Sequence, residues 1–254
     1  MRQRVFALLA TDSDPLTARD FISETTWDDR HRDSDRDRTR LHFLHTRQWH
    51  FVDIDLAHAD IDKACFGHPP VPPGAPASHG VAADCAVDKI DEFVAELRSP
   101  STTAVERLLA LEFLMHFVGD IHQPQNSSDD NDSGGKAKNV TAAGLRSVTL
   151  HGFWDTQFVI RLANNPILVG DTLAAKITPA QVTAWSSGTP ASWSIEAFQV
   201  ATTQAYGKLP EPGASRTYAL STAYVKASTP VVSMQLSRAG VRLATLLNRA
   251  FAAT

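Results

Sequence analysis

The sequence predicts an all-α protein, a mainly α-helical single domain with long loops that spans residues 1–254. Apolar residues recur at helical spacing over much of the chain, most clearly at 87–97, 101–121 and 232–252. Strand-like alternation is confined to 49–56, and no segment repeats at a fixed period. A chain of 254 residues is long enough to bury a substantial core in one large domain or two small ones.

Composition excludes some classes of protein. Apolar residues make up 43% of the chain and charged residues 20%, an ordinary globular balance. The net charge of −4 gives no general attraction to nucleic acid, so any such binding has to be local or metal-mediated. No stretch approaches the ~20 apolar residues of a membrane span. The apolar run over 5–10 is shorter than the core of a secretion signal, so we expect no signal peptide in this chain.

Each element is predicted from local pattern and from turn-forming residues. Helices are expected up to Asp12, where Asp-Ser-Asp-Pro15 ends the first one, and then over 16–30, 87–97, 101–121, 151–163, 178–186, 193–206 and 232–252. The charged run over 31–40 predicts a solvated connection, and the polar segment 125–140 predicts a loop. Residues 49–56 fit either a strand or an extended segment that lines a site. The proline-rich segment 66–86 is expected to be irregular.

The only two cysteines, Cys65 and Cys85, bracket the proline-rich segment. A disulfide bond would suit an oxidising compartment, whereas two free thiols would suit a cytosolic chain. Because this segment has little core of its own, we expect the disulfide.

The chemistry is concentrated in two pairs of residues. His116 and Asp120 lie four residues apart in an apolar helical run, and His151 and Asp155 repeat that spacing. Residues at this spacing share one helix face, so both side chains can reach one metal ion. An imidazole with a carboxylate suits zinc better than calcium or magnesium, which prefer oxygen ligands. One pair alone is more simply a satisfied core histidine beside a capping carboxylate, but two pairs favour a metal site.

Further motifs surround these pairs and carry a resemblance. The order Trp27-Asp-Asp29, Trp49-His-Phe-Val-Asp53, His116-Phe-Val-Gly-Asp-Ile-His-Gln-Pro124, Gly134-Gly135 and Leu150-His-Gly-Phe-Trp-Asp155 extends over most of the chain. It resembles the zinc-dependent single-strand nucleases called nuclease S-one and nuclease P-one, which are akin to bacterial zinc phospholipases C. The resemblance implies an α-helical hydrolase with three zinc ions that cleaves DNA and RNA to 5′-phosphates.

The resemblance also implies metal ligands. Asp29, His50, His116 and Asp120 would hold one zinc, and Asp29 and Asp120 would be the catalytic carboxylates. Asp120 would bridge to a second zinc whose other ligands belong to an N-terminal Trp-Gly…Gly-His segment that is absent here. His151 and Asp155 would hold a third, more exposed zinc together with a histidine from the motif His-Gln-Pro-x-His.

Substrate contacts and cellular location follow from the same resemblance. Phe51 would stack on a base, Asp53 would bond to it, and Arg32 would contact a phosphate of a single-stranded nucleic acid or nucleotide. We expect His122 to be structural, because it lies off the face of His116. The histidines His31, His58, His68 and His79 are expected to be solvated. The resemblance further implies a periplasmic or secreted monomer.

Two departures from the family pattern leave alternatives open. Asn126 stands where the third histidine of the exposed zinc site is expected, and Lys136 and Thr149 depart from the usual asparagines nearby. We therefore expect one firmly bound zinc and weak cleavage. Either the recorded start lies too far downstream in a working nuclease, or the chain is a catalytically inactive zinc-binding remnant. A phospholipase C-like phosphodiesterase is a third alternative, which the base-binding pattern over 49–53 disfavours.

Overall fold

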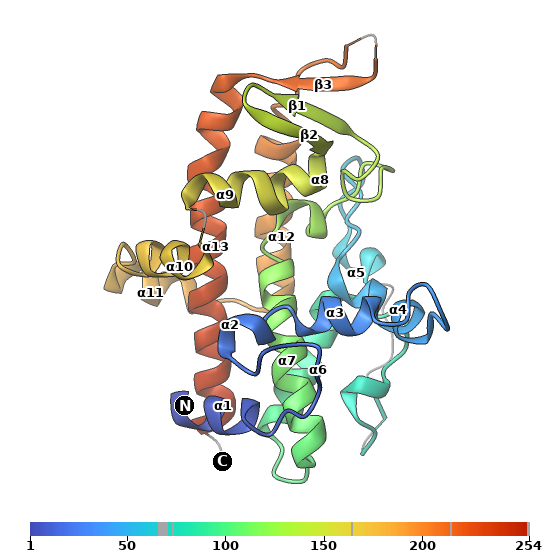
Figure 1. Ribbon diagram of the computed structural model, residues 1–254, viewed down its shortest axis with the longest axis vertical. Helices are drawn as coiled ribbons and strands as arrows, with labels where there is room; N and C mark the ends of the chain where they lie inside the picture. Colours follow the sequence, from blue (N-terminus) through green and yellow to red (C-terminus); the bar gives the residue numbers. More distant parts are fainter. Residues whose placement is uncertain (66–70, 73, 164, 214, 253–254) are drawn as a thin grey trace. The chain divides into compact units, whose positions relative to one another are not determined.

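The computed structural model describes residues 1–254 except 66–70, 73, 164, 214 and 253–254. Most described residues are helical, and three short strands form one small sheet (Figure 1). The expected mainly α-helical fold class is confirmed. The chain divides into two compact units, each made of separate stretches of sequence. Unit 1 comprises 1–51, 65–120 and 242–254, and unit 2 comprises 52–64 and 121–241. The single domain expected over 1–254 remains a prediction.

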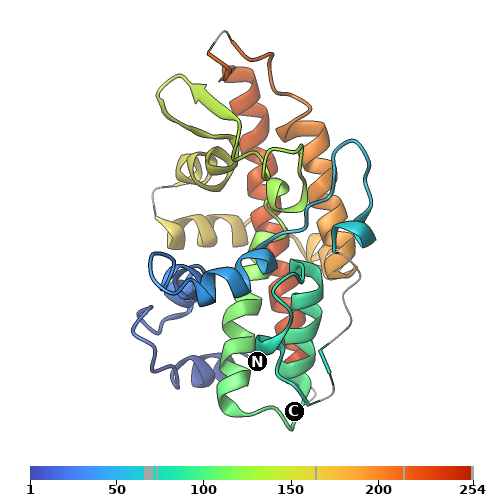
Figure 2. The same ribbon diagram turned by 90° about the vertical axis from the view of Figure 1, so that its right-hand side faces the viewer.

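Unit 1 is built on two adjacent helices, α6 (Ala86–Arg98) and α7 (Ala104–Asp120), which lie side by side in both views (Figures 1 and 2). Helix α6 is amphipathic and buries Ile90, Phe93 and Leu97, whereas α7 is apolar around most of its circumference. The rings of Phe93 and Phe113 stack 4.8 Å apart between the two helices. A helix buried on most sides holds its few polar side chains in fixed positions, and α7 carries His116 and Asp120 in its last turns.

Shorter helices and the end of the C-terminal helix complete the described part of unit 1. The shorter helices are α1 (Arg2–Leu9), α2 (Phe21–Glu24), α3 (Trp27–Asp33), α4 (Leu41–Thr46) and the 3₁₀ turns Arg47–His50 and Ala77–His79. The C-terminal helix, α13 (Thr222–Ala252), belongs to unit 1 from Arg242 on. The predicted single helix over 16–30 is wrong, because the Asp20 side chain accepts bonds from the amides of Ile22 and Ser23 and starts α2 only there. The predicted solvated connection over 31–40 is wrong at its start, since α3 continues to Asp33. Trp27 anchors α3 by packing edge-on against Phe113 at 5.4 Å.

Unit 2 contains the small sheet, whose strand order is β2-β1-β3. Strand β1 (Asn139–Ala142) pairs antiparallel with β2 (Leu145–Thr149) and parallel with β3 (Thr217–Leu220). Gly144, at φ +73°, supplies the left-handed residue of the tight turn between β1 and β2. The predicted loop over 125–140 is therefore wrong at its end, where β1 begins.

The described helices of unit 2 include α5 (Ile61–Ala64), α8 (Leu150–Gly152), α9 (Phe158–Leu162), α10 (Pro166–Ala174), α11 (Pro179–Trp185), α12 (Pro190–Val200) and the first part of α13 (Thr222–Ala252). Residues of α8, α9 and α13 contribute to a buried apolar cluster, whereas α11 buries no residue. A π-helical turn over Phe153–Gln157 joins α8 to α9. Phe153, Trp154 and Phe158 pack with Tyr224 of α13. The sequence prediction missed α10, and α13 begins ten residues before the predicted position 232.

The segment after His50 is extended, as one of the two alternatives for 49–56 predicted. It makes only an isolated bridge between Asp55 and Asp129, and the amide of Val52 donates to the carbonyl of Asn126 at 2.7 Å. Cys65 and Cys85 form the expected disulfide, with a Cα–Cα distance of 5.1 Å. Part of the proline-rich segment that they enclose lies outside the described residues. Among the helices that the structure describes, none combines the length and the apolar character that crossing a membrane requires.

The disulfide closes a loop between residues 20 positions apart and restricts the unfolded chain. Replacing both cysteines, Cys65→Ala with Cys85→Ala, should lower the free energy of unfolding by about 2–4 kcal/mol. Denaturant unfolding monitored by circular dichroism measures this difference. Adding reductant should destabilise the native chain by a similar amount and leave the double variant unchanged, and equal sensitivity of both proteins would contradict this role.

Candidate metal centre

Three elements of unit 1 bring five ionisable side chains together. Helix α3 supplies Asp28 and Asp29, the 3₁₀ turn over Arg47–His50 supplies His50, and α7 supplies His116 and Asp120. Oδ2 of Asp120 lies 3.0 Å from Nδ1 of His50 and 3.2 Å from Nε2 of His116. Two imidazoles from distant parts of the sequence therefore converge on one carboxylate oxygen.

Asp29 lies on the open side of the same group. Its Oδ1 lies 3.9 Å from Nδ1 of His50 and 3.6 Å from Nε2 of His116, and its side chain is 49% exposed. Four ligands at tetrahedral angles and ordinary zinc bond lengths would lie about 3.3 Å from one another. The measured separations, 3.0 to 3.9 Å, bracket that value. The side chains expected to hold the first zinc, Asp29, His50, His116 and Asp120, are thus adjacent.

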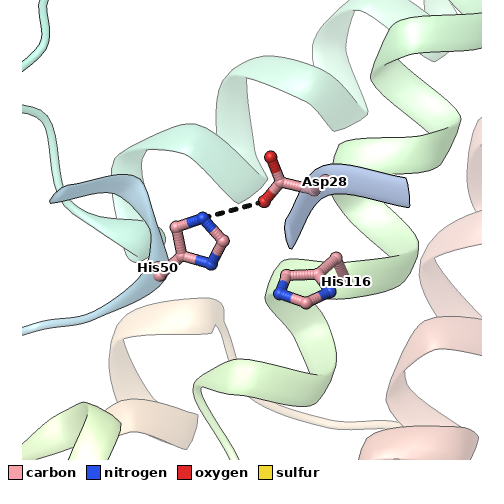
Figure 3. A group of neighbouring side chains, drawn as sticks. All are labelled: Asp28, His50 and His116. Carbon is pink, nitrogen blue, oxygen red and sulfur yellow. Dashed lines mark ion pairs between the residues drawn. The ribbon is translucent and has the colours of Figure 1, made fainter. Parts of the chain in front are cut away.

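The remaining nitrogen of each ring faces an oxygen. Nε2 of His50 lies 3.1 Å from Oδ2 of Asp28 (Figure 3), and Nδ1 of His116 lies 2.8 Å from the carbonyl oxygen of Thr25. Metal-binding histidines are commonly oriented in this way, with one nitrogen toward the ion and the other donating to a carboxylate or carbonyl. The arrangement therefore directs Nδ1 of His50 and Nε2 of His116 to the same point.

The donor set fits a divalent metal ion. Asp28 is fully buried, with Nε2 of His50 3.1 Å from its Oδ2 and no hydrogen-bond partner at its Oδ1. Burial raises the pKa of Asp28, and the neighbouring His50 and His116 oppose that rise. An isolated buried carboxylate is costly, so this site requires positive charge nearby. A cation held by the adjacent imidazoles and carboxylates would supply it.

Without an ion, His116 and Asp120 compensate each other. Burial alone would lower the pKa of His116, but the charge of Asp120 and its hydrogen bond raise it to about 10. Burial alone would raise the pKa of Asp120, but His116 and His50 hold it well below its usual range. Both groups are therefore charged at neutral pH in this state. A metal ion that binds here takes the place of the proton on His116.

The second predicted pair, His151 and Asp155, lies in unit 2 at the start of the π-helical turn. Nε2 of His151 is 3.3 Å from Oδ2 of Asp155, and Nδ1 donates to the carbonyl of Gly134 at 2.8 Å. The side-chain amide of Gln123 donates to Oδ1 of Asp155 at 2.7 Å. The pair is thus oriented like a metal site, but two ionisable ligands are fewer than the three protein ligands that catalytic zinc sites use.

The loop that orients His151 requires glycine. Gly134 and Gly135 have φ of +62° and +82°, and a Cβ atom on Gly134 would lie 2.7 Å from the carbonyl oxygen of Gln125. Asp132 fixes this loop by accepting bonds from the amide of Gly135 at 2.8 Å and from the hydroxyl of Tyr206 at 3.0 Å. The orientation of His151 therefore depends on backbone geometry that a side chain at 134 would disrupt.

The predicted substrate-contact residues lie near the first group or next to it in sequence. Nη1 of Arg32 is 2.6 Å from Oδ1 of Asp29, and Nη2 is 2.9 Å from Oδ2 of Asp33. Phe51 is half-buried and directly follows the turn that carries His50, and Asp53 is exposed. Their contact with a base remains a prediction.

The remaining histidines that the structure describes range from buried to exposed. His31 was expected to be solvated, and that prediction is wrong: its ring stacks between Trp27 at 4.6 Å and His42 at 4.2 Å, and burial lowers its pKa to about 4. His58 and His79 are exposed as expected, and His68 lies outside the described residues. His122 is buried, and its backbone carbonyl accepts a bond from Gln235.

Two groups that support the centre are not predicted from the sequence. The motif Trp27-Asp-Asp29 predicts Asp29 as the ligand and gives no role to Asp28. The burial of Asp28 cannot be read from the sequence, in which the only signal is a second carboxylate adjacent to the predicted ligand. The carbonyl of Thr25 leaves no signal in the sequence, because any residue supplies one.

Comparison with known proteins agrees with this geometry. A sequence model described as S1/P1 Nuclease matches residues 2–252. The chain is similar to Endonuclease 2 of Arabidopsis thaliana, with 33% identity over 66% of this chain and 62% of the relative. It is 30% identical to Nuclease S1 of Aspergillus oryzae, again over 66% of this chain and 62% of the relative. Nuclease P1 of Penicillium citrinum is 26% identical, over 65% of this chain and 66% of the relative.

The matched segments thus span less than two thirds of these relatives. The family model nevertheless matches over residues 2–252, a range that contains both histidine–carboxylate pairs. On that ground the chain belongs to the S1/P1 nuclease family.

Proposed function

We propose that this protein is a zinc-dependent endonuclease that hydrolyses phosphodiester bonds of single-stranded DNA and RNA and leaves 5′-phosphates. The observation that carries the proposal is the convergence of His50 Nδ1 and His116 Nε2 on Oδ2 of Asp120, at 3.0 and 3.2 Å. The names of the related proteins, which are all nucleases or endonucleases, support the reaction class.

The donor chemistry favours zinc as the metal. Two imidazole nitrogens with two carboxylates form a mixed nitrogen and oxygen set, whereas calcium and magnesium prefer oxygen alone. Bound zinc supplies Lewis-acid polarisation of a phosphoryl oxygen. The chain contributes the positioning of that ion, because the second nitrogen of each imidazole is already fixed by Asp28 or Thr25.

Substrate binding is assigned to Arg32, Phe51 and Asp53. Arg32 is held by Asp29 and Asp33, and its planar guanidinium suits a phosphate oxygen pair. Phe51 offers an aromatic face for a base, a contact worth about 1–3 kcal/mol that requires the base to be unstacked from a duplex. Asp53, two residues further on, is exposed and available to accept a hydrogen bond from a base. These residues favour nucleic acid over the phospholipid of a phospholipase C-like enzyme.

A second candidate function is a zinc-binding protein with little or no catalysis. Asn126 supports it, because Asn126 stands where a further imidazole is expected for the pair His151–Asp155, and the side chain that contacts Asp155 is the amide of Gln123. An amide oxygen is a poor zinc ligand, so a zinc ion at His151 and Asp155 should bind weakly. The proposed nuclease activity is accordingly weak. If the protein is a nuclease, its cleavage depends on the centre formed by Asp29, His50, His116 and Asp120. If it is only a zinc-binding protein, no cleavage depends on that centre.

The cellular setting is part of the proposal. A disulfide between Cys65 and Cys85 is typical of oxidising compartments and supports a periplasmic or secreted location. We further propose that the protein acts as a monomer and as one domain over residues 1–254.

Cleavage should be detectable on single-stranded DNA, absent on the matching duplex, and lost on chelation of zinc. His116→Ala removes a direct metal ligand and should reduce the rate by more than about 100-fold. A fluorescently labelled oligonucleotide, separated by gel electrophoresis, measures the rate. His58→Ala, an exposed loop histidine, is the matched control and should cleave like the native chain. Equal activity of His116→Ala and the native chain would refute the assignment.

Asp28 and Asp29 should differ in their effect on metal affinity. Asp28→Asn keeps all four proposed ligands and should weaken zinc binding about 10–100-fold, the usual cost of losing an orienting partner. Asp29→Asn removes a ligand and should weaken zinc binding further. Competition with a chromophoric chelator gives both affinities. A larger loss for Asp28→Asn than for Asp29→Asn would instead place Asp28 on the metal.

Asn126→His should create a tighter site in unit 2. The native chain should hold one zinc firmly, and the variant should hold a second, because a third protein ligand would then accompany His151 and Asp155. Zinc per chain, measured by plasma emission spectroscopy after dialysis, tests this expectation. Asn126→Gln keeps an amide and serves as the control. If Asn126→His binds no more zinc than Asn126→Gln does, the side chain at position 126 does not reach His151 and Asp155.

A further inference from the structure

A second group of ionisable side chains lies in unit 1 and has no role in the proposed reaction. Asp12 follows α1, Glu24 ends α2, and Glu112 lies in the middle of α7. Their exposed fractions are 6%, 0% and 1%, so three carboxylates are buried together. Each offers one oxygen, and these oxygens all lie within 4.8 Å of one another.

Most of these oxygens have no hydrogen-bond donor. Oδ2 of Asp12, both carboxylate oxygens of Glu24 and Oε1 of Glu112 are buried without a partner, and so is the hydroxyl of the nearby Thr17. The other oxygen of Asp12 accepts the amide of Asp14 at 2.7 Å. Unpartnered buried oxygens are rare in folded proteins because each one loses its hydration. Glu24 is the clearest case, since it is fully buried and neither of its oxygens is paired.

The surrounding charges increase this cost. Burial raises the pKa of Glu112, and together with the charges of Asp12, Glu24 and Asp14 it brings that pKa to about 9. Burial also raises the pKa of Glu24; the hydroxyl of Thr17 opposes this rise, and the charges of Asp12, Asp20 and Asp14 add to it. The charges that act on both glutamates are all acidic. The group is stable only with a counter-charge, which is either a set of protons or a bound cation.

The ligand chemistry of this group differs from that of the histidine-containing centre. It offers carboxylate oxygens and one hydroxyl, with no imidazole or thiolate, and oxygen-only sets suit hard cations. Each of the three carboxylates can offer one or both of its oxygens to a cation. Together they approach the about six to eight oxygen ligands that calcium takes, so that few water molecules would be needed to complete the set.

We propose that Asp12, Glu24 and Glu112 bind one hard divalent cation of the calcium type, apart from the ligands Asp29, His50, His116 and Asp120. The ion ties the segment that follows α1 and the end of α2 to the middle of α7. Glu24 immediately precedes Thr25, whose carbonyl orients His116, and Glu112 lies one helical turn before His116. The cation site therefore supports the backbone that positions the metal centre.

Thermal unfolding of the full chain, saturated with zinc and titrated with calcium chloride, tests this proposal. Calcium should raise Tm progressively, by about 5–10 °C at a concentration of about 100 times Kd. Glu112→Gln should remove the calcium response while its Tm without calcium stays equal to or above that of the native chain. Glu106→Gln, the same change two turns earlier on α7, is the matched control and should keep the full response.

Equilibrium dialysis with radioactive calcium should give one ion per native chain, none for Glu112→Gln, and one for Glu106→Gln. Asp12→Asn replaces Glu112→Gln in both measurements if that variant does not fold. The proposal is overturned if calcium leaves the Tm of the native chain unchanged, or if Glu112→Gln responds as the native chain does. A higher Tm of Glu112→Gln together with no calcium response of the native chain would show that protons neutralise the group.

Discussion

The sharing of one carboxylate oxygen by two imidazoles is the interaction on which the metal centre depends. Oδ2 of Asp120 lies within 3.2 Å of both His50 and His116, which come from different elements of unit 1. Bringing charged and polar groups into a nearly dry site opposes folding, so the surrounding structure has to compensate. Helix α7 does so with a largely apolar surface, in which Phe113 and Phe117 pack on the aromatic core and leave His116 little freedom to turn.

Residues that are not metal ligands also hold the centre in position. Trp27 packs on Phe113 of α7 and thereby fixes the start of α3. The next residue, Asp28, turns inward to His50, and the one after it, Asp29, lies at the open side. One buried indole thus sets the position of two carboxylates with different roles. The same helix turn carries Arg32, whose guanidinium is held by Asp29 before any phosphate is present.

Much of this arrangement was predictable from the sequence, and the remainder depended on contacts between distant residues. The spacing of His116 and Asp120 identified a shared helix face, because helical periodicity is local. The sheet was missed because β1 and β3 are only four residues long and pair across more than seventy residues of sequence. His31 was misjudged because a charged run usually indicates solvent, whereas here one of its residues stacks on Trp27.

The backbone constrains positions 126 and 134 of unit 2 to different degrees. At Asn126 the backbone amide donates to the carbonyl of Gln123 at 2.9 Å, and the carbonyl accepts from Val52 at 2.7 Å. Any residue except proline can make both bonds, so the turn over Pro124–Ser127 sets no requirement for a histidine at 126. Gly134 is different, because its positive φ and its contact with Gln125 exclude a side chain. Substitution at 126 therefore leaves both of these backbone bonds in place, whereas a side chain at 134 would disturb the loop that orients His151.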